Sequence, residues 1–132
     1  MQRYEAITNG INVSVLPAFL EEESSPAEDR YVWLYHIEIE NFSTKKVKLL
    51  TRRWEIIDSS GYVDIVDGEG VVGQKPTIEP DQSYEYASAV PLRTPSGMMR
   101  GVFRMITEDK KQLIVKIPPF SLDSPFDMAV AN

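Results

Sequence analysis

The stretch that decides the fold is YVWLYHIEIEN, residues 31–41. Its residues alternate in character, and the apolar set on one face is Tyr31, Trp33, Tyr35, Ile37 and Ile39. A period of two residues is typical of a β-strand, because successive side chains point to opposite faces of a sheet. The other face is apolar at Val32 and Leu34 and polar from His36 onward. The stretch therefore predicts a strand that is buried along one whole face, and on both faces near its start.

Similar segments lie on both sides of this strand, and turn signals such as Asp58-Ser59-Ser60-Gly61 separate them. They cover residues 10–16, 47–57, 62–66, 83–90, 98–106 and 112–117, where Pro118 and Pro119 are expected to end the last strand. With no convincing amphipathic helix, about seven strands predict an all-β sandwich of two half-buried sheets. The predicted core includes Val13, Trp33, Tyr35, Ile37, Trp54 and Tyr86.

The 132 residues suit a single domain, expected over residues 1–125, with 126–132 as a flexible tail. The sequence has no cysteine, which excludes disulfides, thiolate nucleophiles and cysteine-ligated zinc. The first residues do not resemble a signal peptide, and no apolar run is long enough to insert into a membrane. We therefore expect a soluble, cytoplasmic protein.

The net charge of −6 makes non-specific binding of nucleic acid unfavourable, because phosphate contacts need clustered Lys and Arg. Two local charge patches stand out against this average. The basic one comprises Lys45, Lys46, Lys48, Arg52 and Arg53, and the acidic one Glu21, Glu22, Glu23, Glu28 and Asp29. We interpret both patches as solvated strand faces and loops. A weaker alternative for the acidic patch is a binding site for Mg²⁺ or Co²⁺ with carboxylate oxygens as ligands.

The segment DGEGVVG, residues 67–73, spaces Gly68, Gly70 and Gly73 as in a dinucleotide-binding turn. Such a turn leads from a strand into a helix, but Pro76 and Pro80 follow here, and proline breaks a helix. The sequence therefore predicts no Rossmann site. Two interpretations stay open: the glycines bend a strand through positive φ angles, or their N–H groups form a nest that binds an anion.

The candidate anion-binding residues are Gly68, Gly70, Gly73, Arg93 and Arg100. Arginine forks suit phosphate or carboxylate, although these arginines can equally pair with acids of the protein itself. His36 is the only histidine, so no His–His metal pair exists, and we expect it on the surface. No nucleophile–base pair is recognisable, so no catalytic residue and no cofactor is predicted.

Several stretches in the same order resemble the bacterial ApaG family: residues 17–43, RRWEIIDSSG (52–61), GEGVVGQKP (68–76), VPLRTPSGMMRG (90–101) and IPPFSLD (117–123). The resemblance covers nearly the whole chain. It implies a seven-stranded, immunoglobulin-like sandwich of the fibronectin type III kind. It also implies a link to cobalt resistance and magnesium efflux, a gene neighbourhood shared with a dinucleoside polyphosphate hydrolase, and a pyrophosphate-binding role for the glycine motif.

Together these observations predict a non-catalytic binding module that recognises a protein partner, a pyrophosphate- or nucleotide-type anion, or both. The alternative is a small enzyme or metal-handling protein acting on polyphosphate or divalent cations. A homodimer is also expected, because a small open sandwich leaves edge strands that must be covered. The apolar tail residues Phe126, Met128 and Val130 are candidates for that cover.

Overall fold

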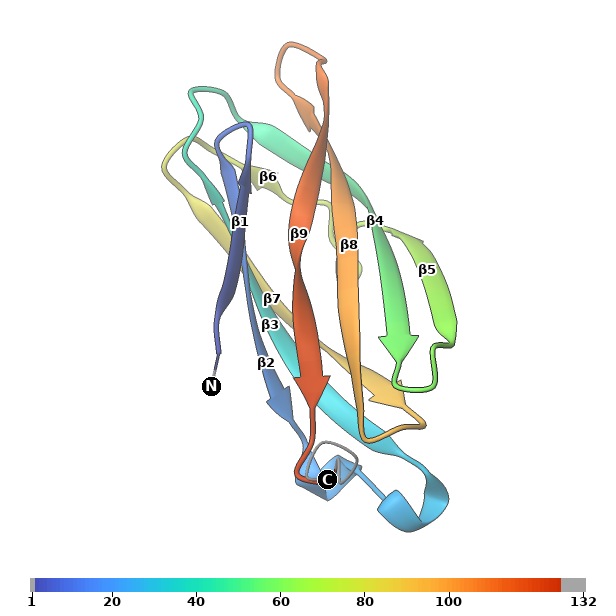
Figure 1. Cartoon of the computed structure of the whole chain (residues 1–132). Coiled ribbons are helices and arrows are strands. Elements are labelled where there is room, and N and C mark those ends of the chain that lie inside the picture. Colours follow the sequence, from blue (N-terminus) through green and yellow to red (C-terminus); the bar gives the residue numbers. More distant parts are fainter. Residues whose placement is uncertain (1, 127–132) are drawn as a thin grey trace.

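The computed structural model describes residues 2–126, in which nine β-strands and two short 3-10 turns follow one another (Figure 1). The strands are β1 (Tyr4–Thr8), β2 (Ile11–Phe19), β3 (Tyr31–Asn41), β4 (Val47–Asp58), β5 (Val63–Glu69), β6 (Thr77–Ile78), β7 (Ser83–Leu92), β8 (Ser96–Thr107) and β9 (Gln112–Asp123). The turns η1 (Glu21–Glu23) and η2 (Pro26–Glu28) connect β2 to β3. No helix in this part of the chain could cross a lipid bilayer.

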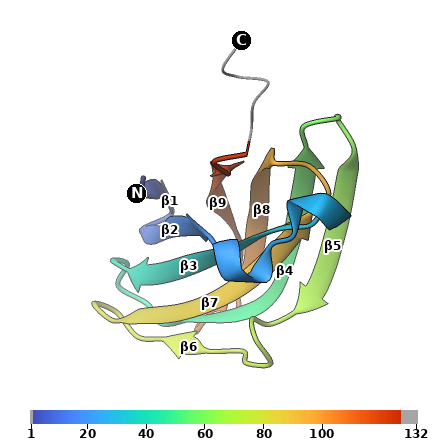
Figure 2. The same cartoon turned by 90° about the horizontal axis from the view of Figure 1, so that it is seen from below.

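Two antiparallel sheets form the sandwich, and Figure 2 shows them as two layers. Sheet I has the strand order β1-β2-β3-β7, and sheet II has the order β5-β4-β8-β9, with β6 also paired to β4. The prediction of an all-β sandwich is therefore confirmed. The boundaries of β3 also match the stretch 31–41 that indicated the fold.

The strand count of seven was wrong, because β1 and β6 were not predicted. The hairpin between β1 and β2 turns at Asn9 and Gly10, whose φ angles of 50° and 81° fit a two-residue type I′ turn. Asn-Gly is the strongest short-range hairpin signal, so the sequence did contain the evidence for β1. The strand β6 has two residues, too few for alternation to reveal.

The last strand continues through Pro118 and Pro119 instead of ending there. Opposite them, the register between β8 and β9 shifts, so that the two prolines face the single residue Arg100. This arrangement is a β-bulge, in which the ladder lacks a regular hydrogen bond. A proline costs little at such a position, which explains why β9 extends to Asp123.

The core lies between the two sheets. Five of the six predicted core residues are confirmed as buried, with at most 6% of the side chain exposed: Val13, Trp33, Tyr35, Ile37 and Trp54. Tyr86 differs, because it is only partly buried and packs at the margin of the core. Phe126 packs its ring against Phe19 and Tyr31, whereas Met128 and Val130 lie outside the described residues.

The two long sides of the sandwich differ. On one side β1 and β9 are joined, because the Lys116 N–H donates to the Thr8 hydroxyl (3.2 Å) and the Ser121 N–H donates to the Tyr4 hydroxyl (3.3 Å). On the other side, β5 ends sheet II and β7 ends sheet I, and in the described part of the chain neither strand has a further neighbour. This open side gives access to the space between the sheets.

Candidate functional site

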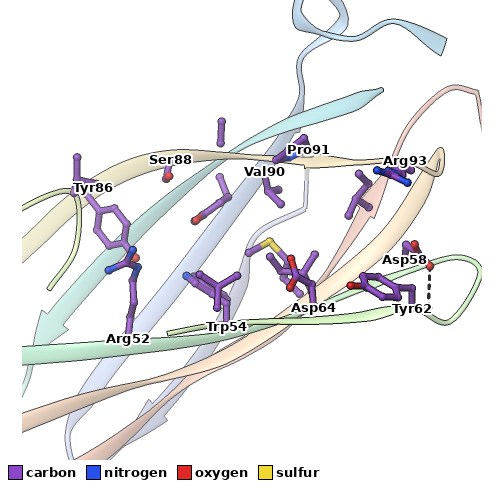
Figure 3. A pocket seen from close by; sticks show the side chains of 17 residues that line it. Arg52, Trp54, Asp58, Tyr62, Asp64, Tyr86, Ser88, Val90, Pro91 and Arg93 are labelled. Atoms are coloured by element: carbon purple, nitrogen blue, oxygen red, sulfur yellow. Dashed lines mark hydrogen bonds between the residues drawn. The ribbon is translucent and has the colours of Figure 1, made fainter. Parts of the chain in front are cut away.

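A cleft of about 550 Å³ lies on the open side of the sandwich, between β5 and β7. Figure 3 shows its lining side chains, most of which come from β4 and β5 below and from β7 above. Its floor is apolar and aromatic, formed by Tyr35, Trp54, Ile56, Val90, Leu92 and Met99. Its polar groups are Arg52, Asp58, Asp64, Tyr86, Ser88 and Arg93. A concave site of this size that combines an apolar floor with convergent polar groups is typical of a small-molecule binding site.

Arg52 reaches the cleft because it lies on the inner face of sheet II. Side chains at positions 52, 54 and 56 share one face of β4, and Trp54 and Ile56 both face the other sheet. A β-bulge between Leu49 and Thr51 resets the alternation just before this segment. A charged side chain therefore sits in phase with the core residues of its strand.

The glycine segment holds the Arg52 guanidinium in place. The Nη1 of Arg52 donates to the carbonyl oxygens of Gly70 (2.8 Å) and Glu69 (3.2 Å). A side chain on Gly68 would overlap the guanidinium, so glycine is required for this close approach. None of the ion pairs between residues 2 and 126 includes Arg52, so its positive charge lacks a carboxylate partner there.

The remaining glycines shape a tight turn next to this contact. Gly70 has a φ of 60°, and a side chain there would collide with the carbonyl of Gln74. Val71 and Gln74 exchange two backbone hydrogen bonds (2.8 and 2.9 Å) around Val72 and Gly73. The Gly70 N–H donates to the carbonyl of Leu50 (2.9 Å). The N–H groups of Gly70, Val71 and Gln74 are thus engaged by backbone carbonyls, and the segment offers carbonyls to Arg52.

Tyr86 projects into the cleft from β7, beside Arg52 (Figure 3). Its hydroxyl oxygen is buried and has no hydrogen-bond partner among residues 2–126. Burial raises the pKa of the Tyr86 phenol far above its ordinary value, and the charge of Arg52 opposes this only in part. A buried hydroxyl without a partner costs free energy, so this group is available to a ligand that supplies an acceptor.

The other end of the cleft carries both signs of charge. Arg93, in the connection after β7, lies across the cleft from Asp58 and Tyr62, and Asp64 projects from β5 nearby (Figure 3). The Asp58 carboxylate accepts bonds from the Ser60 hydroxyl (2.7 Å) and the N–H groups of Ser60 (2.9 Å) and Tyr62 (3.0 Å). These bonds, chiefly that of the Ser60 hydroxyl, lower the pKa of Asp58. Asp58 therefore stays ionised and structurally engaged.

The structure separates the two arginines that the sequence grouped with the glycines. Arg93 lines the cleft and has no ion pair within residues 2–126. Arg100 lies on the outer face of sheet II, where both its Nε and its Nη2 bond to Glu55 at 2.8 Å. Arg52 and Arg93 therefore line one cleft, and the glycine segment lies next to Arg52, whereas Arg100 belongs to an outer-face ion pair.

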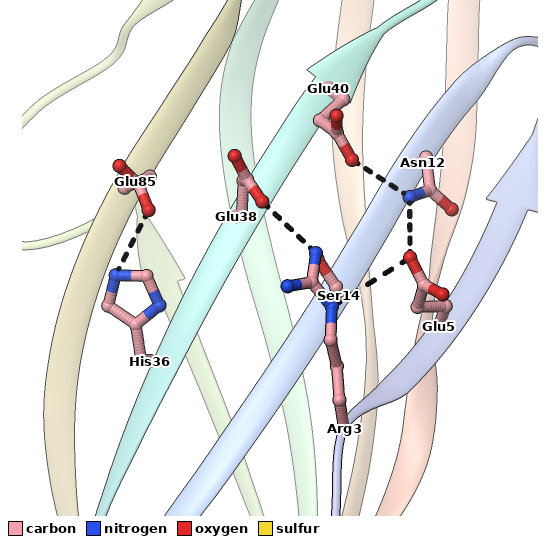
Figure 4. Close-up of polar contacts among 8 residues, drawn as sticks. All are labelled: Arg3, Glu5, Asn12, Ser14, His36, Glu38, Glu40 and Glu85. Carbon is pink, nitrogen blue, oxygen red and sulfur yellow. Dashed lines mark hydrogen bonds and ion pairs between the residues drawn. The ribbon is translucent and has the colours of Figure 1, made fainter.

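His36 lies on the outer face of sheet I, the face that points away from the cleft. There it pairs with Glu85 (3.4 Å), next to a network in which Arg3 bonds to Glu38 and Asn12 bonds to Glu40 (Figure 4). The acidic residues Glu21, Glu22 and Glu23 form the exposed turn η1. Within residues 2–126, no three His, Asp or Glu side chains converge in a way that could hold a metal ion.

Sequence reasoning did not identify Arg52 and Tyr86 as site residues. Arg52 was interpreted as part of a solvated basic stretch, and Tyr86 as a core residue. The signal for Arg52 was its position two residues before Trp54, since residues two apart share a strand face. No comparable signal existed for the Tyr86 hydroxyl, because the absence of a partner depends on which sheets meet at that edge.

The fold and site thus define a small β-sandwich with a ligand-sized cleft between two open sheet edges. A sequence model of the ApaG domain matches residues 21–107. The chain is 52% identical to "Protein ApaG" of Agrobacterium fabrum and 51% identical to that of Brucella anthropi, each over 98% of this chain and 99% of the relative. A crystal structure from Bordetella pertussis superposes with a TM-score of 0.85 at 37% identity, covering 88% of this chain and 94% of that one. The chain belongs to the ApaG family.

Proposed function

We propose that the protein is a cytoplasmic, non-catalytic binding module whose cleft receives a ligand through a phosphate-type anionic group. The observation that carries this proposal is the Arg52 guanidinium, which faces the cleft without a carboxylate partner in residues 2–126. Removing a cation from water is costly unless a counter-charge compensates it. A bound anion supplies that counter-charge and accepts a hydrogen bond from the Tyr86 hydroxyl.

The body of the ligand rests on the aromatic floor. Trp54 packs edge-on against Tyr35, with ring centroids 5.4 Å apart, and both line the cleft. A planar ring next to an anionic group matches this surface, as in a nucleotide, because aromatic floors bind rings well. Arg93 provides a second positive charge for a longer polyphosphate or for an extended ligand.

The positions of the histidine and of the cleft serine are compatible with a binding role. The only histidine lies on the opposite side of sheet I, paired with Glu85. Ser88 is the one serine among the residues that line the cleft. The family resemblance implies a link to cobalt and magnesium. We propose that this link acts through the bound ligand and not through metal-coordinating residues of the protein. A protein partner is the second candidate, supported by exposed apolar side chains at the cleft margin.

The two tryptophans allow a direct test. Trp54 lines the cleft, whereas the indole N–H of Trp33 donates to the carbonyl of Asp123 (2.9 Å) in the core. In a titration with pyrophosphate, the NMR signal of the Trp54 indole should shift in a saturable way while that of Trp33 stays fixed. Succinate in place of pyrophosphate distinguishes a carboxylate ligand from a phosphate ligand.

The control variants separate the cleft from charge in general. Arg52→Ala should weaken pyrophosphate binding by about tenfold or more, the scale for a charge-assisted hydrogen bond. Arg100→Ala, which removes a guanidinium from the outer face of sheet II, should leave the titration unchanged. Arg52→Lys shows whether charge alone suffices, and circular dichroism checks the fold of each variant. A Trp54 signal unmoved by millimolar pyrophosphate and succinate would refute an anion site here.

A further inference from the structure

β5 is an edge strand with free backbone groups, at the outer margin of sheet II (Figures 1 and 2). The Asp58 N–H donates to the Tyr62 carbonyl (3.0 Å), which fixes which residues of β5 face β4. Peptide groups of successive residues point to opposite edges of a strand. Those of Val63, Ile65 and Asp67 therefore point away from β4, where the described chain has no other strand.

The other two edges differ from β5. β7 carries Pro91, and alternation along β3 and β7 places that proline on the outward-facing edge, so that this one position offers no N–H. β9 carries Pro118 and Pro119, and its N–H groups at Lys116 and Ser121 bond to side chains of β1. Proteins protect edges in these ways to prevent unwanted strand pairing. β5 has no proline and no lysine.

Exposed apolar side chains lie on both faces of β5 and at its ends, and Tyr62 and Val72 are those on the cleft side. Val63 and Ile65 are 46% and 50% exposed, Tyr62 just before the strand is 68% exposed, and Val72 in the turn after it is 62% exposed. Val72 also has a φ of 47°, a left-handed conformation that is costly for a β-branched residue. The equivalent turn position between β1 and β2 holds Asn9, which tolerates this conformation. The valine is thus kept at a site where stability favours asparagine or glycine.

We propose that β5 pairs with β5 of a second copy of this chain, antiparallel, about a twofold axis at Ile65. In that register Ile65 meets its own equivalent, and Val63 lies opposite Asp67 of the other copy, so outward peptide groups bond to each other. Tyr62 then lies opposite Gly68 of the second copy, beside the turn that presents Val72. The exposed aromatic before the strand and the strained valine after it then both lie at the ends of the paired strands.

The charges along β5 permit this pairing. Asp67 is paired with Arg53 (3.5 Å) and Glu69 with Lys75 (2.7 Å) within one chain. The register places Asp64 opposite Val66 of the second copy, so no two carboxylates face each other directly. The same surface serves both copies, which gives a closed dimer and leaves no free β5 edge.

The test is the oligomeric state of the full chain and of three variants. Sedimentation velocity from about 1 to about 100 µM, the range in which a weak dimer dissociates, should show dimers of the wild type. Ile65→Lys puts a charge on the twofold axis and should give a monomer of unchanged circular dichroism. Ile114→Lys is the matched control, because Ile114 is 55% exposed on β9 and outside the proposed interface. It should remain dimeric, as should Arg52→Ala, which probes the anion site separately.

Hydrogen exchange gives a second readout that is independent of mass. The amides of Val63, Ile65 and Asp67 should be protected in the wild type and should exchange faster in Ile65→Lys. A wild type that stays monomeric over the whole concentration range overturns the proposal. A dimer that survives Ile65→Lys, or that Ile114→Lys abolishes equally, places the interface elsewhere and also overturns it.

Discussion

At the scale of single residues, the cleft combines two polar groups that the protein itself does not satisfy. One guanidinium nitrogen of Arg52 donates to the carbonyls of Glu69 and Gly70, but the guanidinium has no carboxylate partner among the described residues. The Tyr86 hydroxyl has no hydrogen-bond partner in the described chain. Buried polar groups normally find partners, and exceptions concentrate where a ligand binds. Stability and binding should therefore respond in opposite directions to substitutions here.

Tyr86→Phe removes the hydroxyl that lacks a partner and keeps the ring. We expect the free energy of unfolding to stay equal or to rise by about 1 kcal/mol, since an unsatisfied buried hydroxyl is unfavourable. Pyrophosphate binding should weaken at the same time. Denaturant unfolding and the indole titration measure the two effects. A loss of more than about 1 kcal/mol would mean that the hydroxyl has a stabilising partner.

Trp33→Ala tests the core between the two sheets. The side chain is 1% exposed, packs edge-on against Phe19 at 5.3 Å, and donates its indole N–H to Asp123. Emptying a site of this kind should cost about 3–5 kcal/mol in urea unfolding. Phe42→Ala is a control, because the Phe42 side chain is 57% exposed and its removal should cost little.

At the scale of elements, the turn after β5 shows a conflict between local preference and the residue present. Val72 and Gly73 have φ angles of 47° and 77°, the geometry of a type I′ turn, which favours Asn-Gly. The chain uses Asn-Gly between β1 and β2 and Val-Gly here. Strain of this kind tends to persist at functional sites.

Val72→Asn should accordingly raise the free energy of unfolding by about 1 kcal/mol, because asparagine accepts the left-handed conformation more readily. The same variant should weaken the dimer, since it removes an apolar side chain from the proposed interface. Thermal unfolding below the dissociation concentration isolates the first effect. Were Val72→Asn less stable than the wild type as a monomer, the valine would be making contacts that outweigh its strain.

The elements also show how far a sequence can be interpreted alone. Alternation revealed β3 completely and located most of the other strands, because a strand buried on one face repeats every two residues. It failed at Arg52, whose inward direction depends on the bulge near Leu49, and at Pro118 and Pro119, which a bulge accommodates. Bulges depend on the partner strand, so a single strand's pattern does not predict them.

At the scale of the whole molecule, the two tyrosines of the cleft link stability to alkaline pH. Burial raises the pKa of both Tyr35 and Tyr86 above the ordinary value of 10.0. In the unfolded chain these phenols lose their protons near pH 10, while the folded protein retains them. The unfolded state then binds fewer protons, so the free energy of unfolding falls as the pH rises above 10.

Urea unfolding of the wild type and of Tyr86→Phe between pH 8 and pH 11 checks this. Both proteins should lose stability toward high pH, but the variant should lose less, because one of the two raised groups is gone. Below pH 9 the difference between them should be constant. Parallel curves across the whole range would show that Tyr86 ionises as freely in the folded protein as in the unfolded chain.

The side of the sandwich away from the cleft has a consequence for biosynthesis. Lys116 and Ser121 bond to Thr8 and Tyr4 across sequence separations of 108 and 117 residues. A chain emerging from the ribosome cannot form these contacts until nearly all of it has been made. During translation the edge of β1 that faces β9 in the folded protein therefore has no partner. We therefore expect β9 to pack against β1 only after the chain is released. This step should be slow, because the residues that it brings together are so distant in sequence. Stop codons within β9 should give insoluble products even though the cleft residues are all present.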